Sequence, residues 1–232
     1  MLWDVDYTLL DAGGSGRAVY RSVFRDLFGR DPDQVAPMGG RTERAIIVHT
    51  LAMAGISDPA RHVDAFIAEL ARRAPELRAT TAARGHALPG AAAALAAVAA
   101  LGPAVVQSVL TGNAPATARA KLAAVGLDAH LDLDVGAYGD HHEVRAELVH
   151  LARARACAAY GREFGGQATV LVGDTPLDVE AALATGARAV AVATGGPTAA
   201  ELAAAGAGAV LPDLTDTAAV VAAIVGVAAP SP

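Results

Sequence analysis

The spacing of hydrophobic positions changes twice along the 232-residue chain. A short apolar run opens the sequence and ends in two carboxylates, Asp4 and Asp6. Residues 15–85 then repeat apolar positions every three or four residues, which is the period of an amphipathic helix, and hold no convincing strand. After Leu88, short apolar runs alternate with helical stretches. This alternation predicts a parallel sheet that helices cover on both faces.

The predicted fold class is therefore α/β: a doubly wound parallel, Rossmann-like sheet with an all-helical segment inserted after the first strand. The predicted domains are a discontinuous core, 1–14 and 86–232, and a helical cap, 15–85. In the cap we expect helices over 17–28 and 42–54 and a third that begins at Asp58. In the core we expect strands over 104–110, 131–136, 168–173, 188–193 and 208–211, and helices over 114–125, 143–161, 177–185, 198–205 and 215–227.

Composition narrows the function classes. The net charge of −6 argues against a nucleic-acid partner, which usually requires a basic face. The uncharged stretch between Arg84 and Arg119 is broken by glycine and proline, so we predict no membrane partner. Cys157 is the only cysteine, and a leader is not expected because only three residues precede Asp4. A cytoplasmic location is the resulting expectation, and the oligomeric state stays open.

Polar residues follow three of the apolar runs. Asp4 and Asp6 leave the first strand with side chains on the same face, because strand residues alternate faces. Thr111, Gly112 and Asn113 follow the second run and lead into a helix, where a hydroxyl and a helix N-terminus suit a phosphate oxygen or serve as a simple cap. The third run ends in Gly173-Asp174-Thr175-Pro176-Leu177-Asp178. Chemistry in such sheets gathers beyond the carboxyl ends of the strands, so these residues are expected to converge.

Taken in this order, the three segments resemble the first, second and fourth motifs of the haloacid dehalogenase superfamily. The helical segment after the first motif resembles the cap of its phosphoglycolate phosphatase-like members. This resemblance spans nearly the whole chain and implies an enzyme, a phosphoric monoester hydrolase that acts on a small phosphorylated substrate.

The resemblance also implies roles. Asp4 would be the nucleophile that accepts the phosphoryl group, and Asp6 would protonate the leaving oxygen and then activate water. Thr111 would hold phosphate oxygens together with the substrate-binding residues Gly112 and Asn113. The physical requirements agree, since phosphoryl transfer depends mainly on positioning and on charge neutralisation.

Magnesium is the implied cofactor. Its expected ligands are Asp4, the Asp6 carbonyl and Asp174, with Asp178 either a ligand or a neighbour that supports one. Hard carboxylate oxygens are the ligands that Mg²⁺ prefers. A metal also lets an anionic aspartate approach an anionic phosphate.

The third motif of the superfamily supplies a cation, for which the chain offers two candidates. Lys121 is the only lysine, yet it lies about two turns into its helix, roughly 12 Å along the axis, which favours a solvated helix face. Arg145 begins the helix that precedes the third run, and we favour it as the catalytic cation because its fork binds two oxygens. Lys121 remains a candidate for substrate binding.

Four other residues have open roles. Arg41 at the start of a cap helix either contacts the far end of the substrate or lies on the surface. Tyr7 stands where many relatives have glycine, so a positive φ would strain it, and we expect its ring to pack on the cap. His141 and His142 are expected to be solvated loop residues.

Within the superfamily, the residues favour a phosphatase. The dehalogenases lack an equivalent of Asp6, and phosphonate cleavage uses a cap lysine that residues 15–85 do not contain. A sugar phosphomutase would keep every motif and stays an alternative. A non-catalytic binding or regulatory protein would be expected to have lost an essential carboxylate, and none is missing.

Overall fold

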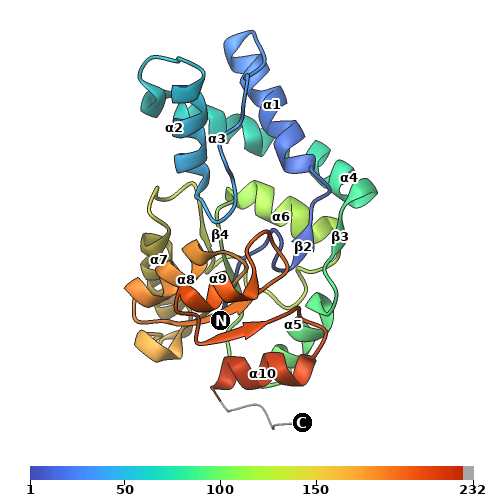
Figure 1. Ribbon diagram of the computed structural model, residues 1–232, viewed down its shortest axis with the longest axis vertical. Coiled ribbons are helices and arrows are strands. Elements are labelled where there is room, and N and C mark those ends of the chain that lie inside the picture. The colour runs from blue at the N-terminus through green and yellow to red at the C-terminus, as the bar shows by residue number, and fades with distance from the viewer. Residues whose placement is uncertain (227–232) are drawn as a thin grey trace.

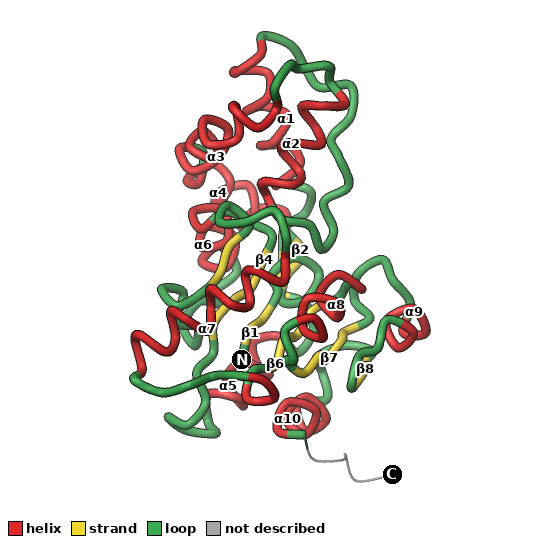
Figure 2. Tube along the Cα trace, turned by 90° about the vertical axis from the view of Figure 1, so that its left-hand side faces the viewer, coloured by secondary structure: helices red, strands yellow, loops and turns green. Residues whose placement is uncertain are grey.

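The computed structural model describes residues 1–226. The last six residues of the predicted core, 227–232, and the final position of the helix expected over 215–227 lie outside the described residues. Six parallel strands form the central sheet, in the order β5-β4-β1-β6-β7-β8 (Figures 1 and 2), and Figure 2 shows the run from β4 through β1, β6 and β7 to β8. Their bounds are Leu2–Trp3 (β1), Ser108–Thr111 (β4), Ala137–Tyr138 (β5), Val170–Gly173 (β6), Arg188–Val192 (β7) and Ala209–Leu211 (β8). The predicted α/β class is confirmed.

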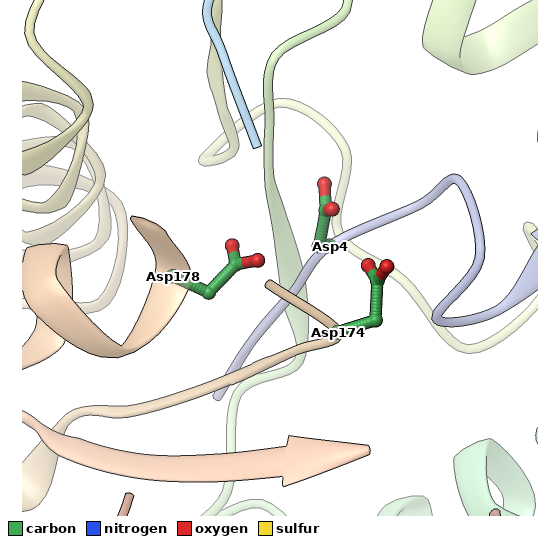
Figure 3. A group of neighbouring side chains, drawn as sticks. All are labelled: Asp4, Asp174 and Asp178. Atoms are coloured by element: carbon green, nitrogen blue, oxygen red, sulfur yellow. The ribbon is translucent and has the colours of Figure 1, made fainter. Parts of the chain in front are cut away.

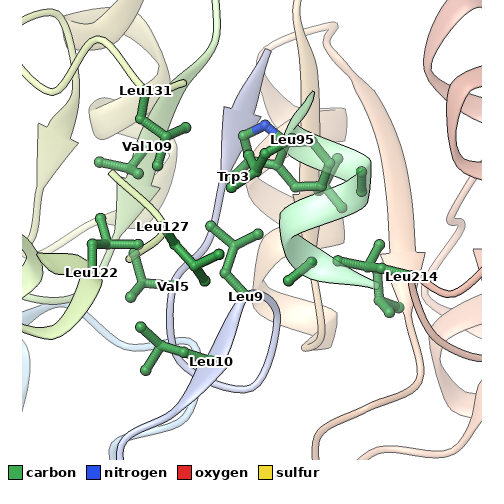
Figure 4. Packing of buried hydrophobic residues seen from close by; sticks show 14 of the residues in the cluster. Trp3, Val5, Leu9, Leu10, Leu95, Val109, Leu122, Leu127, Leu131 and Leu214 are labelled. Carbon is green, nitrogen blue, oxygen red and sulfur yellow. The ribbon is translucent and has the colours of Figure 1, made fainter. Parts of the chain in front are cut away.

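Helices cover both faces of the sheet because side chains alternate along each strand. Trp3 and Val172 enter an apolar cluster with α5 (Ala91–Ala99), α6 (Pro115–Ala124) and α10 (Thr217–Val225), shown in part in Figure 4. Leu2 and Leu171 enter a second cluster on the other face. It is completed by α7 (Arg145–Tyr160), α8 (Pro176–Ala184) and α9 (Ala199–Ala204). A short 3-10 turn, Gly166–Ala168 (η2), precedes β6.

The helices within residues 15–84 lie beyond one end of the sheet (Figures 1 and 2). The elements are α1 (Ser15–Phe28), α2 (Glu43–Met53), the 3-10 turn η1 (Pro59–His62), α3 (Val63–Arg72) and α4 (Ala74–Arg84). They share their own apolar cluster, in which the rings of Tyr20 and Phe66 lie 4.6 Å apart. We call residues 15–85 the helical insertion. Its standing as a separate cap domain stays a prediction.

The chain enters and leaves the helical insertion through two paired strands, which the sequence did not predict. Leu10–Asp11 (β2) pairs antiparallel with His86–Ala87 (β3). Each strand is only two residues long, too short for any period of hydrophobic residues to show. The pair fixes both connections of the insertion side by side.

Two predicted strand ranges are wrong. The strand expected over 104–110 is observed over Ser108–Thr111, where Ser108 lies opposite Leu2 of β1. Before Ser108, the carbonyl of Val106 accepts from the amino group of Met1 at 2.8 Å, outside the regular strand. The weak strand expected over 131–136 lies at Ala137–Tyr138 instead. Leu131 and Val135 are buried loop residues, and their apolar side chains gave this segment the hydrophobic pattern that is typical of a strand.

The helical insertion departs from prediction in its second half. The helix expected from Asp58 begins as the 3-10 turn η1 and becomes α-helical at Val63. A further helix, α4, starts at Ala74, where Pro75 stands in the first turn and its lack of an N–H is tolerated. Within residues 1–226, no helix combines the length and apolar character needed to cross a membrane.

Candidate active site

Three adjacent strand ends build the centre of the site. The strand β1 lies between β4 and β6, so Asp4, Thr111 and Asp174 follow or end neighbouring strands at the same edge. The backbone N–H of Asp4 donates to the carbonyl of Val172 at 2.8 Å, which continues the pairing of β1 with β6. Figure 3 shows the side chains of Asp4, Asp174 and Asp178 at this edge. The structure therefore brings together residues that lie 170 positions apart.

The carboxylates of these three aspartates are close enough to share a cation. One oxygen from each of Asp4, Asp174 and Asp178 lies within 4.8 Å of the others, and all three residues are buried. Burial raises the pKa of Asp4 to about 6, although the nearby Arg145 opposes the shift. Burial and the charges of Asp4 and Asp178 raise the pKa of Asp174 to about 8. Such mutual repulsion is what a bound divalent cation relieves, so this donor set fits a metal such as Mg²⁺.

The Asp178 carboxylate is already engaged by protein donors. Its Oδ1 accepts hydrogen bonds from Arg145 at 2.6 and 2.9 Å, and its Oδ2 accepts from the backbone and hydroxyl of Thr175 at 3.1 and 2.6 Å. A Cβ on Gly173 would lie 2.2 Å from the Asp178 carboxyl carbon, so only glycine fits there. These contacts favour Asp178 as a support for the site over a direct metal ligand.

Arg145 bridges two of the aspartates. Its Nη2 lies 3.1 Å from Asp4 Oδ1 and 2.6 Å from Asp178 Oδ1, and the residue is buried. Burial alone would lower its pKa, but the charges of Asp178 and Asp4 outweigh burial and raise it. The guanidinium is therefore a fixed positive charge beside the proposed nucleophile.

Lys121 corrects one expectation. The sequence favours a solvated helix face for this residue, yet Lys121 is only 5% exposed. Its Nζ donates to both oxygens of Asp6, at 2.7 and 2.8 Å, and to Asn113 Oδ1 at 2.7 Å. The error came from measuring only the distance along the helix axis: the four-carbon side chain points back along α6 toward its N-terminus, where Asn113 and Asp6 lie. Both candidate cations therefore lie at the site: Arg145 contacts Asp4, and Lys121 contacts Asp6.

The Asp6 carboxylate stands outside the group of three aspartates. Besides Lys121, it accepts a hydrogen bond from Asn113 Nδ2 at 2.7 Å. The expected metal contact of Asp6 was its backbone carbonyl, and that expectation stays a prediction. The two opening aspartates therefore have different surroundings: Asp4 faces Arg145 and the other carboxylates, whereas Asp6 faces Lys121 and an amide.

The loop after β4 is shaped by its own side chains and by the helical insertion. Thr111 Oγ1 accepts from Asn113 Nδ2 at 2.8 Å. A Cβ on Gly112 would lie 2.0 Å from the carbonyl oxygen of Arg41, so this close approach requires glycine. The carbonyl of Gly112 also accepts from the backbone N–H of Glu43 at 2.8 Å. The insertion thus docks on the loop through backbone contacts.

Sequence reasoning missed Glu43. This first residue of α2 follows the N-cap Thr42, whose hydroxyl accepts from Ala45 N–H. Glu43 is 5% exposed, and burial raises its pKa to about 7 against the opposing effect of Lys121. An acidic residue in the first turn of a helix is common enough to pass unnoticed. Only its burial at the site makes it unusual.

The other open residues take the following places. Arg41 donates to the carbonyl of Ala45 at 3.3 Å and shares a 2.8 Å contact with His49, so its fork is partly tied within the insertion. Tyr7 has a positive φ of 58° and is 48% exposed, and the packing of its ring on the helical insertion stays a prediction. His141 and His142 are exposed loop residues, as expected.

A cavity of about 230 Å³ connects these groups, somewhat smaller than is usual for small-molecule sites. Its lining comes from both the sheet edge and the helical insertion. The lining includes Asp4, Asp6, Tyr7, Arg17, Arg41, Glu43, Thr111, Gly112, Asn113, Lys121, Arg145 and Asp174.

The match to known families follows this geometry. The family model for haloacid dehalogenase-like hydrolases matches residues 1–183, well over half of the chain. The chain therefore belongs to the haloacid dehalogenase-like hydrolases, a family that generally uses a divalent metal ion. No curated protein sequence matches it.

Several solved structures share the fold. A hydrolase from Pseudomonas syringae is 24% identical, with 93% of each chain covered and a TM-score of 0.62. CbbY from Rhodobacter sphaeroides in complex with phosphate is 20% identical, with 93% of this chain and 94% of that chain covered and a TM-score of 0.62. A provisionally named β-phosphoglucomutase from Bacteroides vulgatus is 16% identical, with 97% and 88% covered and a TM-score of 0.65. At these identities the likeness concerns the fold.

Proposed function

We propose that this protein is a Mg²⁺-dependent phosphatase that hydrolyses a small phosphorylated metabolite through an aspartyl-phosphate on Asp4. The proposal rests mainly on one observation: the two opening aspartates have different partners. Asp4 lies beside Arg145 and the other carboxylates, and Asp6 lies beside Lys121 and Asn113. Two carboxylates in unlike surroundings suit a division of roles between nucleophile and acid–base group.

In the proposed reaction, an oxygen of Asp4 attacks the phosphorus atom while Asp6 donates a proton to the leaving oxygen. Asp6 then removes a proton from the water that hydrolyses the aspartyl-phosphate, which returns both carboxylates to their starting states. Thr111 and the loop after it orient phosphate oxygens, and Arg145 offsets negative charge beside Asp4. Bound Mg²⁺ would neutralise charge on the phosphoryl group; Asp4 and Asp174 would hold it, with Asp178 supporting them.

The first test is release of phosphate from p-nitrophenyl phosphate with and without Mg²⁺. We expect turnover that depends on the metal, and covalent labelling of Asp4 that borohydride reduction of the acyl phosphate reveals by peptide mass. Absence of turnover with a broad panel of phosphate monoesters would contradict the proposal. It would favour the binding or regulatory alternative if those compounds still bind.

A sugar phosphomutase of the same family is the second candidate, since it needs the same pair of aspartates. The fold it shares with the Bacteroides vulgatus protein supports no choice between the two. The test is the acceptor: incubation with β-glucose 1-phosphate either releases phosphate or forms glucose 6-phosphate. We expect the protein to transfer the phosphoryl group to water.

A further inference from the structure

Glu43 is a buried carboxylate whose position the proposed chemistry does not require. Its Oε1 has no hydrogen-bond partner among residues 1–226, and its Oε2 has only the backbone N–H of Ala114 at 3.4 Å. No basic group of the described residues lies within ion-pair distance, 4.0 Å, of this carboxylate. Burial of a carboxylate with so few partners costs desolvation free energy. A ligand that supplies the missing hydrogen-bond donor would offset part of this cost.

The structure holds Glu43 in place at the pocket. Its backbone N–H is bonded to Gly112, and the next N–H, that of Arg44, donates to the carbonyl of Gly139 at 3.0 Å. Thr42 fixes the same turn by donating to the carbonyl of Glu143 at 2.9 Å. The two backbone bonds satisfy N–H groups at the start of α2 with carbonyls of the loops after β4 and β5. Glu43 lines the same cavity as Asp4 and the loop Thr111–Asn113, and these bonds fix its backbone there.

A helix-start role does not explain these facts. An acidic side chain gains up to about 1 kcal/mol near a helix N-terminus, and it can do so while exposed to water. Glu43 is buried instead, where desolvation of its charge raises its pKa to about 7. Helix stability alone would favour an exposed carboxylate.

We propose that Glu43 determines substrate specificity by accepting a hydrogen bond from a hydroxyl or ammonium group on the leaving group of the phosphorylated substrate. The inference rests on the proposed phosphatase function and adds a substrate class to it. The same carboxylate disfavours substrates that carry a second anion near the phosphate, because like charges repel in a poorly hydrated site. The favoured substrates are polyol, sugar or amino-alcohol phosphates, and the disfavoured ones are phosphorylated carboxylic acids.

The pocket also contains a group that would favour the opposite class. Arg17 of α1 lines the cavity and is exposed, and it would attract a carboxylate on the substrate. The two residues thus predict opposite preferences between hydroxyl and carboxylate ligands. A direct comparison of such ligands decides between them.

The experiment measures binding, so that it does not depend on turnover. Four phosphonates of similar size, which a phosphatase does not cleave, are titrated by calorimetry at pH 8 with Mg²⁺: ethylphosphonate, 2-hydroxyethylphosphonate, 2-aminoethylphosphonate and phosphonoacetate. At this pH the Glu43 carboxyl is mostly ionised. We expect the hydroxyl or the amino compound to bind about 10-fold more tightly than ethylphosphonate, the order of one hydrogen bond to a charged group. Phosphonoacetate should bind about 10-fold more weakly than ethylphosphonate.

Glu43→Gln and the control Glu76→Gln complete the design. Glutamine keeps an acceptor for a hydroxyl but loses the charge. Phosphonoacetate should therefore bind about 10-fold more tightly relative to ethylphosphonate than it does in the wild type, and 2-aminoethylphosphonate should lose any advantage over ethylphosphonate. Glu76 is an exposed residue of the same insertion and lines no part of the cavity, so its variant should keep the wild-type ratios. The stronger of the hydroxyl and amino ligands identifies the donor.

Two results would overturn the inference. One is wild-type protein that binds phosphonoacetate as tightly as ethylphosphonate or more tightly, which needs no variant to interpret. The other is unchanged binding ratios in folded Glu43→Gln protein. Neither result bears on hydrolysis, which the release of phosphate from monoesters tests separately.

Discussion

The two halves of the pocket are built differently. On the sheet edge, Asp178 has protein donors on both oxygens, and Arg145 contacts two carboxylates. On the helical insertion, Glu43 is equally buried but has one oxygen without a partner among the described residues. The polar groups at the sheet edge are thus held in place by protein hydrogen bonds before a substrate binds. The carboxylate on the insertion, in contrast, can gain a hydrogen bond from a ligand. This difference suggests that reaction and selectivity are separated in space.

Replacement of the proposed nucleophile should have the largest effect. Asp4→Asn keeps the shape but loses the attacking carboxylate, so we expect turnover to fall by at least about 10⁴-fold, the order seen when a nucleophile is removed. Steady-state kinetics with p-nitrophenyl phosphate and the covalent label measure the change. Near-normal turnover in purified Asp4→Asn protein would refute covalent catalysis at this residue.

Loss of the cation beside Asp4 should come next. Arg145→Ala removes a charge partner of the transition state and should lower kcat/KM by about 10²–10³-fold. Arg145→Lys, which keeps the charge but not the fork, should recover part of the activity. If Arg145→Ala cost less than Lys121→Ala, the third-motif cation would be Lys121 instead.

The free energy of unfolding should respond differently to replacement of Asp178 on the sheet edge and of Glu43 on the insertion. Asp178→Asn weakens a buried ion pair with Arg145 and should lower the free energy of unfolding by about 3 kcal/mol. Glu43→Gln removes a poorly paired buried charge and should leave stability unchanged or raise it by about 1 kcal/mol at pH 8. Urea unfolding without ligand measures both. Equal losses in the two variants would mean that the insertion half is as fully paired as the sheet edge.

Lys121 lies at the boundary between the halves and should have an intermediate effect. Lys121→Ala removes the donor that holds Asp6 and Asn113, so we expect kcat to fall by about 10–10²-fold, less than the about 10²–10⁴-fold contribution of a positioned acid–base group because Asp6 itself remains. Arg119→Ala is the matched control, since Arg119 lies on the same helix and pairs with Asp134 on the surface. A loss no greater than that of the control would restore the original expectation for Lys121.

The smallest effect concerns pH. In metal-free protein, the raised pKa values of Asp4 and Asp174 mean that the folded state holds more protons than the unfolded state between about pH 4 and pH 8. Their contribution to stability therefore falls as pH rises through this window. We expect the pH-dependent loss in Tm over this window to be several degrees smaller in Asp174→Asn, and Mg²⁺ to reduce the loss in wild-type protein. An identical pH profile for both proteins would remove the evidence for repulsion between these carboxylates.

Sequence alone predicted the sheet edge better than the insertion. The order of apolar runs placed Asp4, Thr111 and Asp174 after strands, and the topology of a parallel sheet then required their ends to meet. Glu43 had no such signal, because its importance comes from docking of α2 on the Gly112 loop. Lys121 was misjudged for a related reason: a residue number gives the rise along a helix but not the reach of a long side chain. Contacts between segments remote in sequence were therefore the part that pattern reasoning could not supply.

The paired strands β2 and β3 have a consequence for how this fold can vary. Since Leu10 lies opposite Ala87 and Asp11 opposite His86, the chain leaves for the helical insertion and returns at one spot. The strand order of the sheet does not depend on what lies between those residues. Insertions or deletions within 15–85 can therefore accumulate in evolution without a change in the strand order. The surface of α6 and the loops after β4 and β5, which contact the insertion, must adapt to them. Duplication or exchange of the segment between β2 and β3 would change the lining of the pocket while the ends of the sheet strands keep their positions.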